Sequence, residues 1–350
     1  MALEADIKGT LVRLLNIPSA SYEEGELVRE VLRILEEKGV EGEIDSNGNI
    51  IAALQGQGGK KIILNAHLDT VRGEIPVKME EGLVYGRGAA DMKGGLTGII
   101  EALAVLKNKK PKYDVYFHGV VREEVDGYGT YSLNKQDAKG DLAIIAEPTR
   151  LNISLGQKGR VTLKAKIHGK ASHASKPELG VNAILNAYEA ISRIYKIKTK
   201  NHRIIGDGSI AVTTISGGKA SNVIPDECLI TMDRRLTIGE TPELALEQIR
   251  KALKGLEGRV YLKERPTPYS TPFLIERNPL IDELHSSVKK FHPCNFGVSR
   301  ATTDASFYVN SGIPAVIFGP GEPDLAHTME EHIDPGEVIA FTKALVGFLR

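Results

Sequence analysis

Histidines and carboxylates recur at five points along this chain, and most of these points directly follow a hydrophobic run. The first two are the string His67-Leu68-Asp69 and Asp91, which stands in Asp91-Met92-Lys93-Gly94-Gly95. The others, in chain order, are Glu123-Glu124, Glu147 and His327. Together they supply two imidazoles, one carboxylate that can bridge, two terminal carboxylates and one spare glutamate. A hydrolase that uses two metal ions needs this inventory.

The string His67-Leu68-Asp69 comes directly after the hydrophobic run 61–66. Side chains two positions apart on an extended strand point to the same side. We therefore expect His67 to bind a metal ion while Asp69 orients its ring. An ordinary polar loop is the alternative, and the pair alone does not decide between the two interpretations.

Asp91 stands between glycines, in the segment Tyr85–Gly95 (YGRGAADMKGG). Glycine on both sides lets the backbone approach closely and leaves a carboxylate unobstructed at the start of a helix. A bridging ligand needs that access, because its two oxygens must face different ions. The competing interpretation is that Asp91 only caps the helix that follows it.

The pair Glu123-Glu124 follows the apolar run 115–121. Two adjacent acids in a turn point in different directions, so one can bind a metal ion while the other moves a proton. Glu147 follows the run 142–146, and His327 comes after the run 314–318. Each could instead be a surface acid or a structural histidine. Their joint occurrence, mostly at strand ends, indicates a single site.

The pattern before residue 150 predicts strands alternating with helices. Helical spacing is found at 3–16, 22–39, 94–107 and 128–134, and strand-like runs are found at 49–54, 61–66, 113–121 and 141–146. This alternation favours an α/β fold in which helices cover a mixed sheet. Open sheets of this kind collect their chemistry at the carboxyl ends of the strands, where His67, Glu123 and Glu147 are expected.

The pattern changes after Thr149. The segments 160–167, 181–195, 209–216, 228–235, 242–254 and 259–264 read as β-α-β-β-α-β, a ferredoxin-like unit. Prolines at 266, 268 and 272 then mark a linker, and helix and strand return over 278–350, with an apolar strand at 314–318 and a final helix from Pro335. We therefore expect a catalytic domain, 1–156 and 265–350, that is interrupted by an inserted domain, 157–264.

The bulk composition argues against several classes of partner. Lys+Arg and Asp+Glu both number 45 in this chain of 350 residues, so no basic field for nucleic acid is expected. No apolar run approaches the length of a membrane span, and the first residues lack the pattern of a signal peptide. The two cysteines, Cys228 and Cys294, stand far apart in sequence. Free thiols in a cytoplasmic protein are the expectation.

These motifs, in this order, resemble those of the M20 family of zinc-dependent metallopeptidases and deacylases. The resemblance covers almost the whole chain. It implies two metal ions that share one bridging carboxylate, Asp91. His67, Asp91 and Glu147 would hold one ion, and Asp91, Glu124 and His327 would hold the other. Zn²⁺ is the expected metal, although Co²⁺ or Mn²⁺ can occupy such ligands.

The resemblance also implies roles around the metals. Glu123 would be the general acid and base, Asp69 would orient His67, and the peptide bond from Asp91 to Met92 would be cis. Relatives with glutamate at the position of Glu147 tend to be deacylases or carboxypeptidases. One departure is Arg72, where the family often has proline, and it puts the shape of that loop and the substrate preference in doubt.

The inserted unit resembles the lid and dimerisation domain of the family. In Gly169–Ser175 (GKASHAS), His173 would stabilise the oxyanion, in dimers that of the partner subunit. Asn222 and Arg235 match lid positions that contact substrate, and Arg235 would bind the substrate carboxylate. A strand-face salt bridge is the alternative for Arg235. The turn Gly319-Pro320-Gly321 would line the pocket, with Gly319 and Gly321 as substrate-binding residues.

The leading hypothesis is hydrolysis of the amide in a small N-acyl amino acid by a homodimer. A carboxypeptidase that releases a C-terminal amino acid from a short peptide uses the same chemistry, since both substrates place an amide beside a free carboxylate. A non-catalytic metal- or ligand-binding relative is the third possibility. The intact Glu123, the five metal ligands and His173 argue against it.

Overall fold

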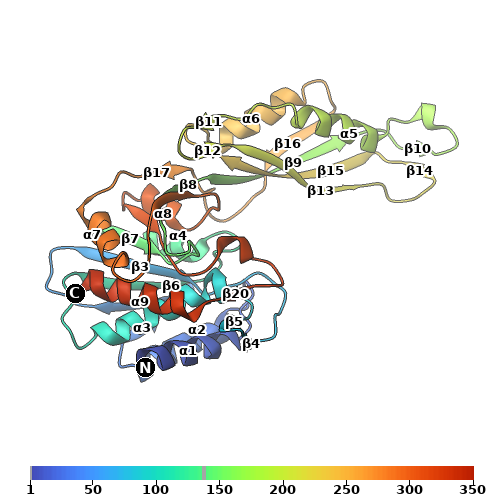
Figure 1. Ribbon diagram of the computed structural model, residues 1–350. Coiled ribbons are helices and arrows are strands. Elements are labelled where there is room, and N and C mark those ends of the chain that lie inside the picture. The colour runs from blue at the N-terminus through green and yellow to red at the C-terminus, as the bar shows by residue number, and fades with distance from the viewer. Residues whose placement is uncertain (1, 136–138) are drawn as a thin grey trace. The chain divides into compact units, whose positions relative to one another are not determined.

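The computed structural model describes residues 2–135 and 139–350, which form two compact units (Figure 1). The first unit contains the residues up to Gln157 and Ile275–Arg350, and the second is Lys158–Leu274. The second unit ends after Leu274 rather than after residue 264. The reason is that the Arg160 N–H donates to the Ser270 carbonyl and the Tyr269 hydroxyl contacts the carbonyls of Thr162 and Lys263.

A mixed sheet forms the centre of the first unit. Its strands lie in the order β1 (Gly42–Ile44), β2 (Ile50–Leu54), β6 (Asp114–Val120), β3 (Lys61–His67), β7 (Leu142–Ile145), β19 (Ala315–Ile317) and β8 (Ile153–Gln157), with β18 (Phe296–Ser299) beside β8. The four central strands, from β6 to β19, are parallel. Their carboxyl ends therefore meet at one edge, as the sequence predicts.

Helices cover both faces of this sheet (Figure 1). Alternation along β3 turns Ile62, Leu64 and Ala66 into the main hydrophobic core, whereas Asn65 points the other way and donates to Thr130 and Tyr308. The core side carries α1 (Ala2–Leu15), α2 (Gly25–Glu37), α3 (Gly94–Leu106), α7 (Pro279–Val288) and α9 (Pro335–Leu349). The other side carries α4 (Tyr128–Lys135) and α8 (Ala305–Asn310). Among the described helices, none is long and apolar enough to cross a membrane.

The start of α3 is shaped by close packing. A short kinked segment, η1 (Ala89–Lys93), precedes it, and Asp91 and Met92 have non-helical backbone angles there. The peptide bond between these two residues is cis, which confirms the predicted isomer. A side chain at Gly95 would place its Cβ 2.2 Å from the carbonyl oxygen of Ala146, next to Glu147. Glycine at this position lets the first turn of α3 pack against the end of β7.

A small three-stranded sheet joins distant parts of the first unit. It contains β4 (Lys78–Glu80), β5 (Leu83–Tyr85) and β20 (His332–Ile333), and β20 pairs with β5. These strands were not predicted from the sequence. Their pairing brings the segment that follows His327 next to the loop that leads to Asp91.

The second unit follows the predicted β-α-β-β-α-β order. Its elements are β9 (Gly159–His168), α5 (Ala183–Ile194), β13 (Ser209–Gly217), β15 (Glu227–Leu236), α6 (Pro242–Ala252) and β16 (Gly258–Leu262). The four strands form an antiparallel sheet in the order β13-β15-β9-β16, and one face of this sheet packs against the two helices. Shorter strands are β10 (Ser172–His173), β11 (Asn201–His202), β12 (Gly206–Asp207), β14 (Val223–Ile224) and β17 (Phe273–Leu274).

Candidate metal centre

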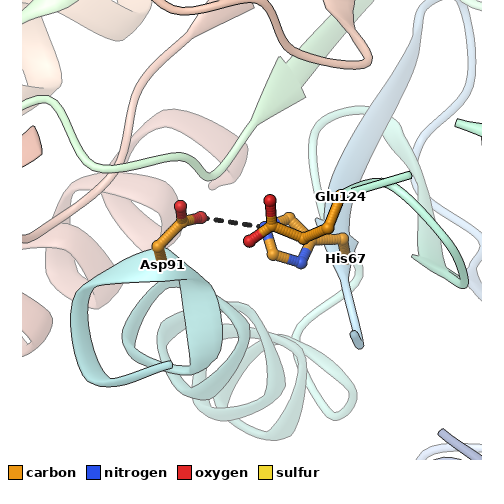
Figure 2. A group of neighbouring side chains, drawn as sticks. All are labelled: His67, Asp91 and Glu124. Atoms are coloured by element: carbon orange, nitrogen blue, oxygen red, sulfur yellow. Dashed lines mark hydrogen bonds and ion pairs between the residues drawn. The ribbon is translucent and has the colours of Figure 1, made fainter. Parts of the chain in front are cut away.

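His67, Asp91 and Glu124 converge at the carboxyl edge of the sheet (Figure 2). His67 is the last residue of β3, Asp91 lies in η1, and Glu124 follows β6. The Nε2 atom of His67 lies 2.9 Å from Oδ1 of Asp91. One ligand atom from each of the three residues falls within 4.8 Å of the others, so these side chains could hold one metal ion.

The second oxygen of Asp91 faces a second imidazole. Its Oδ2 lies 3.3 Å from Nε2 of His327, and the same nitrogen lies 2.9 Å from Oε1 of Glu124. His327 reaches this position from the segment after β19, where its backbone has a φ of 65°. Asp91 therefore presents one oxygen to each histidine, which is the arrangement expected of a carboxylate that bridges two ions.

Glu123 and Glu147 form a second group with His67. Ligand atoms of these three residues also lie within 4.8 Å of one another, and Oε1 of Glu147 lies 3.8 Å from His67 Nε2. Burial, together with repulsion from neighbouring carboxylates, raises the pKa of Glu123 and of Glu147 well above the usual range. Positive charge would relieve this repulsion, and imidazole with carboxylate is a ligand set that zinc accepts.

The neighbouring carboxylates raise the pKa of both histidines. Hydrogen bonds that the His327 ring donates to Asp91 and then to Glu124 raise the pKa of His327 to about 10. Burial would lower the pKa of His67, but Asp91 and Glu147 hold it well above its ordinary value. Both imidazoles therefore attract protons where cations would otherwise be bound.

Asp69 contacts the cluster through two different groups. Its backbone carbonyl oxygen lies 2.7 Å from Nδ1 of His67, whereas its carboxylate oxygen Oδ1 is 3.7 Å from that nitrogen. The carboxylate accepts hydrogen bonds from the backbone N–H groups of Glu123 and Glu124, at 2.9 and 3.1 Å, and from the Ser21 hydroxyl. The His67 ring is therefore held mainly by a carbonyl, and the carboxylate fixes the turn that carries the two glutamates.

Glu331 and Arg87, which were not predicted as site residues, hold Asp91 in place. Oε1 of Glu331 accepts hydrogen bonds from the N–H groups of Ala90 and Asp91, at 3.1 and 3.0 Å, and Oε2 accepts from Arg87 at 2.7 Å. Glu331 is buried. The only signal was an acidic pair, Glu330-Glu331, shortly after His327, and such a pair looks like any solvated surface pair.

The turn Gly319-Pro320-Gly321 is not among the described residues that line the cavity of Asp91 and Glu147, and its role in substrate binding stays a prediction. A Cβ at Gly319 would lie 2.3 Å from the carbonyl oxygen of Ala146 and 2.5 Å from that of Glu147. Gly321 is buried with a φ of 99°. The turn therefore supports the backbone of Glu147. Arg72, the departure from the family pattern, is an exposed side chain paired with Glu23 at 2.7 Å.

The remaining predicted residues, His173, Asn222 and Arg235, all belong to the second unit. Strand β10 carries His173, whose Nδ1 lies 2.7 Å from the Ser175 hydroxyl. Asn222 precedes β14, and its carbonyl accepts from the N–H of Ala174 at 2.9 Å. Arg235 lies on β15 and donates to Asp233 at 2.8 Å, which is the strand-face salt bridge considered above. Their roles at the metal cluster stay predictions.

The fold and the site together define a class of protein. An α/β sheet that gathers two imidazoles and four carboxylates at its carboxyl edge is typical of metal-dependent hydrolases. The model of peptidase family M20/M25/M40 matches residues 63–350. The chain belongs to this family, and it is a hydrolase that acts on amide bonds.

Relatives and solved structures agree with this assignment. A proposed LysW-lysine/LysW-ornithine hydrolase of Pyrobaculum aerophilum is 30% identical, covering 97% of this chain and 96% of the relative. A succinyl-diaminopimelate desuccinylase of Corynebacterium glutamicum is 29% identical, covering 95% and 93%. The crystal structure of an M20 family metallo-carboxypeptidase from Sulfolobus solfataricus has the same fold, with a TM-score of 0.82 at 20% identity over 98% of this chain and 99% of that one.

Proposed function

We propose that this protein removes the acyl group from N-acyl amino acids with the help of two zinc ions. The observation that carries the proposal is the position of Asp91, whose two oxygens face His67 and His327 at 2.9 and 3.3 Å. His67, Asp91 and Glu147 would hold one ion, and Asp91, Glu124 and His327 the other. Co²⁺ or Mn²⁺ could replace zinc at such ligands.

Glu123 is the proposed general base and acid. When bound, the two ions lower the pKa of water and polarise the scissile carbonyl. Glu123 takes the proton from the attacking water and then gives it to the departing amine, so the C–N bond breaks to give a carboxylate and an amine. The hydrogen bond from its backbone N–H to Asp69 supports this role, because it fixes the turn that aims the Glu123 carboxyl group.

Residues of the second unit are proposed to complete the site. His173 would stabilise the developing oxyanion, Asn222 would contact substrate, and Arg235 would bind the free carboxylate with its planar fork of donors. The salt bridge to Asp233 orients the Arg235 side chain, which is 30% exposed.

The names of two relatives support the substrate class. One is a desuccinylase, and the other is a hydrolase of lysine and ornithine conjugates, so both release an amino acid from an N-linked group. A carboxypeptidase that acts on short peptides would use the same machinery and is the main alternative. A relative that binds metal without catalysis is the second alternative.

The experiment is a measurement of amine release by the zinc-loaded protein from N-acetyl and N-succinyl amino acids, beside blocked dipeptides. Preference for the acyl amino acids supports a deacylase, and preference for the dipeptides supports the carboxypeptidase. The matched control is Glu123→Gln, which should keep both zinc ions and lose about 10²–10⁴-fold in turnover. Full metal occupancy without turnover of any substrate would favour the non-catalytic alternative.

We also propose a homodimer through the second unit and a cytoplasmic location. Strand β13 lies at the edge of its sheet, and α5 next to it exposes Leu185 (65%) and Tyr188 (72%). An open edge beside exposed apolar side chains is what a second copy could cover. Both cysteines are free and buried, which is compatible with a reducing compartment.

A further inference from the structure

A cavity of about 570 Å³ opens beside the metal cluster within the first unit. Asp91 and Glu147 lie at one end of it, so a molecule bound there would touch the metal ligands. The floor is formed by three neighbouring strands. Ser154 of β8 is paired in register with Gly297 of β18 on one side and with Ile317 of β19 on the other.

The floor of this cavity carries a hydroxyl group. Ser154 is only 6% exposed as a residue, and it is one of the residues that line the cavity. A serine hydroxyl can donate a hydrogen bond to a ligand bound there. Gly297 leaves room for one, because a Cβ at that position would meet no atom within 4 Å.

The wall carries one basic side chain. Arg300 lies in the loop between β18 and α8, and it is the sole lysine, arginine or histidine among the described residues that line the cavity. It forms no ion pair with any residue that the structure describes. Three acids are among the described residues that line the cavity: the proposed metal ligands Asp91 and Glu147, and Asp324. Asp324 comes from the segment before His327.

We propose that this cavity binds a second carboxylate of the substrate, with the Arg300 guanidinium as its ion-pair partner and the Ser154 hydroxyl as a hydrogen-bond donor. This inference rests on the proposed function and narrows its substrates to acyl amino acids with two carboxylates. Arginine suits this task because its planar fork matches a carboxylate. Asp324 would repel a carboxylate placed on its side and so directs that group towards Arg300.

Two parts of such a substrate could carry the second carboxylate. It could belong to the acyl group, as in N-succinyl amino acids, or to the side chain of the amino acid, as in N-acetylglutamate. Both present the same chemistry to Arg300, so the experiment must separate them.

The first arm measures binding and does not depend on turnover. Zinc-loaded protein is titrated calorimetrically with succinate, glutarate and adipate, and with butyrate, pentanoate and hexanoate as matched monoacids. The diacid of the best-fitting length should bind about 10–100-fold more tightly than its monoacid. Arg300→Gln should abolish this advantage, and Ser154→Ala should reduce it. Arg29→Gln, which removes an exposed arginine on α2 outside the cavity lining, should leave it unchanged.

The second arm measures kcat/KM for two matched pairs: N-succinyl against N-acetyl derivatives of one amino acid, and N-acetylglutamate against N-acetylglutamine. If Arg300→Gln lowers only the succinyl rate, the carboxylate belongs to the acyl group. If it lowers only the glutamate rate, the carboxylate belongs to the amino acid.

The outcomes separate this inference from the proposed function. An unchanged preference for diacids in Arg300→Gln, with normal hydrolysis of N-acetyl substrates, would overturn the carboxylate site and leave the deacylase intact. Diacid binding that depends on Arg300, in a protein that hydrolyses no acyl amino acid, would support the site and reject the deacylase. A wild-type protein that binds diacids no more tightly than monoacids would also overturn the site.

Discussion

The carboxylate of Asp69 holds the backbone of Glu123, since its Oδ1 accepts the Glu123 N–H at 2.9 Å. Its other oxygen accepts the N–H of Glu124 at 3.1 Å. One buried acid thus fixes a proposed metal ligand and the proposed base together, and its own carbonyl also holds the ring of His67. Asp69 acts on the chemistry through all three residues without being a metal ligand itself.

Replacing Asp69 should therefore damage both metal binding and turnover. In Asp69→Asn the side-chain amide turns a donor towards one of the two backbone N–H groups, so the turn must shift. We expect zinc affinity or kcat to fall by about 10–100-fold. Competition with a chelator and steady-state kinetics would measure the two effects separately. Ser21→Ala, which removes only the hydroxyl hydrogen bond to Asp69, should have a much smaller effect, and equal losses in the two variants would contradict this account.

Glu331 and Arg87 form a buried pair that holds the backbone of Asp91. Glu331→Ala leaves the Arg87 guanidinium without its partner, so the free energy of unfolding should fall by about 3 kcal/mol. It also removes the acceptor of the Asp91 N–H, so zinc affinity should fall by about 10–100-fold. Denaturant unfolding and chelator competition are the measurements.

A double variant separates these two effects of Glu331. Arg87→Met with Glu331→Met removes both charges and keeps apolar volume, so most of the stability should return. Zinc affinity should stay low, because the Asp91 N–H still lacks an acceptor. Recovery of both properties would show that the pair acts only through stability.

The proposed dimer can be tested on the exposed face of α5. Leu185→Glu with Tyr188→Glu places two charges among the apolar side chains that a partner would cover, and we expect a dimer to become a monomer. Sedimentation velocity at several concentrations would measure this. Leu244→Glu, at an exposed position on α6, is the matched control. A wild-type protein that sediments as a monomer would reject the dimer.

His118 should make the fold sensitive to acid. It is buried on β6 with its Nδ1 2.9 Å from the Tyr308 hydroxyl, and burial lowers its pKa to about 4. The unfolded chain, with a pKa of about 6.5 at this residue, binds the proton first as the pH falls. Stability from this residue is therefore complete above about pH 6.5, and up to about 3 kcal/mol is lost by about pH 4.

Comparison of wild type with His118→Gln would isolate this term. Glutamine can still bond to the Tyr308 hydroxyl but does not titrate. Free energies of unfolding of the two metal-free proteins should be measured between pH 7 and pH 4. The difference between them should change over that range in the predicted direction, and parallel curves would contradict the assignment.

Much of the fold could be predicted from sequence because its signals are local and strong. The run before His67 and the alternation of Val161, Leu163, Ala165 and Ile167 gave strands within one or two residues of those observed. Strands β8 and β18 were missed. They are short and contain glycine and serine, so neither alternation nor a long apolar run distinguishes them.

The cluster was predictable where residue type and order carried the information. His67, Asp91 and His327 occur together and in the order that a two-metal site requires, so the set indicates a metal site where each residue alone does not. Glu331 was not predictable, because nothing in an acidic pair tells which member turns inward to bond a backbone N–H. The sequence also does not decide the role of Gly319, since a glycine-rich turn near a site can line a cavity or support a neighbouring strand.

The position of His327 in the chain has a consequence for synthesis. Residues that precede the second unit already include His67, Asp91, Glu124 and Glu147, but His327 comes from the segment that follows it. A ribosome must therefore finish the second unit and most of the C-terminal segment before the second oxygen of Asp91 can face an imidazole. Chains that end before His327, from a premature stop or from proteolysis, would lack this imidazole. Only a chain that extends past His327 could therefore form the whole proposed cluster.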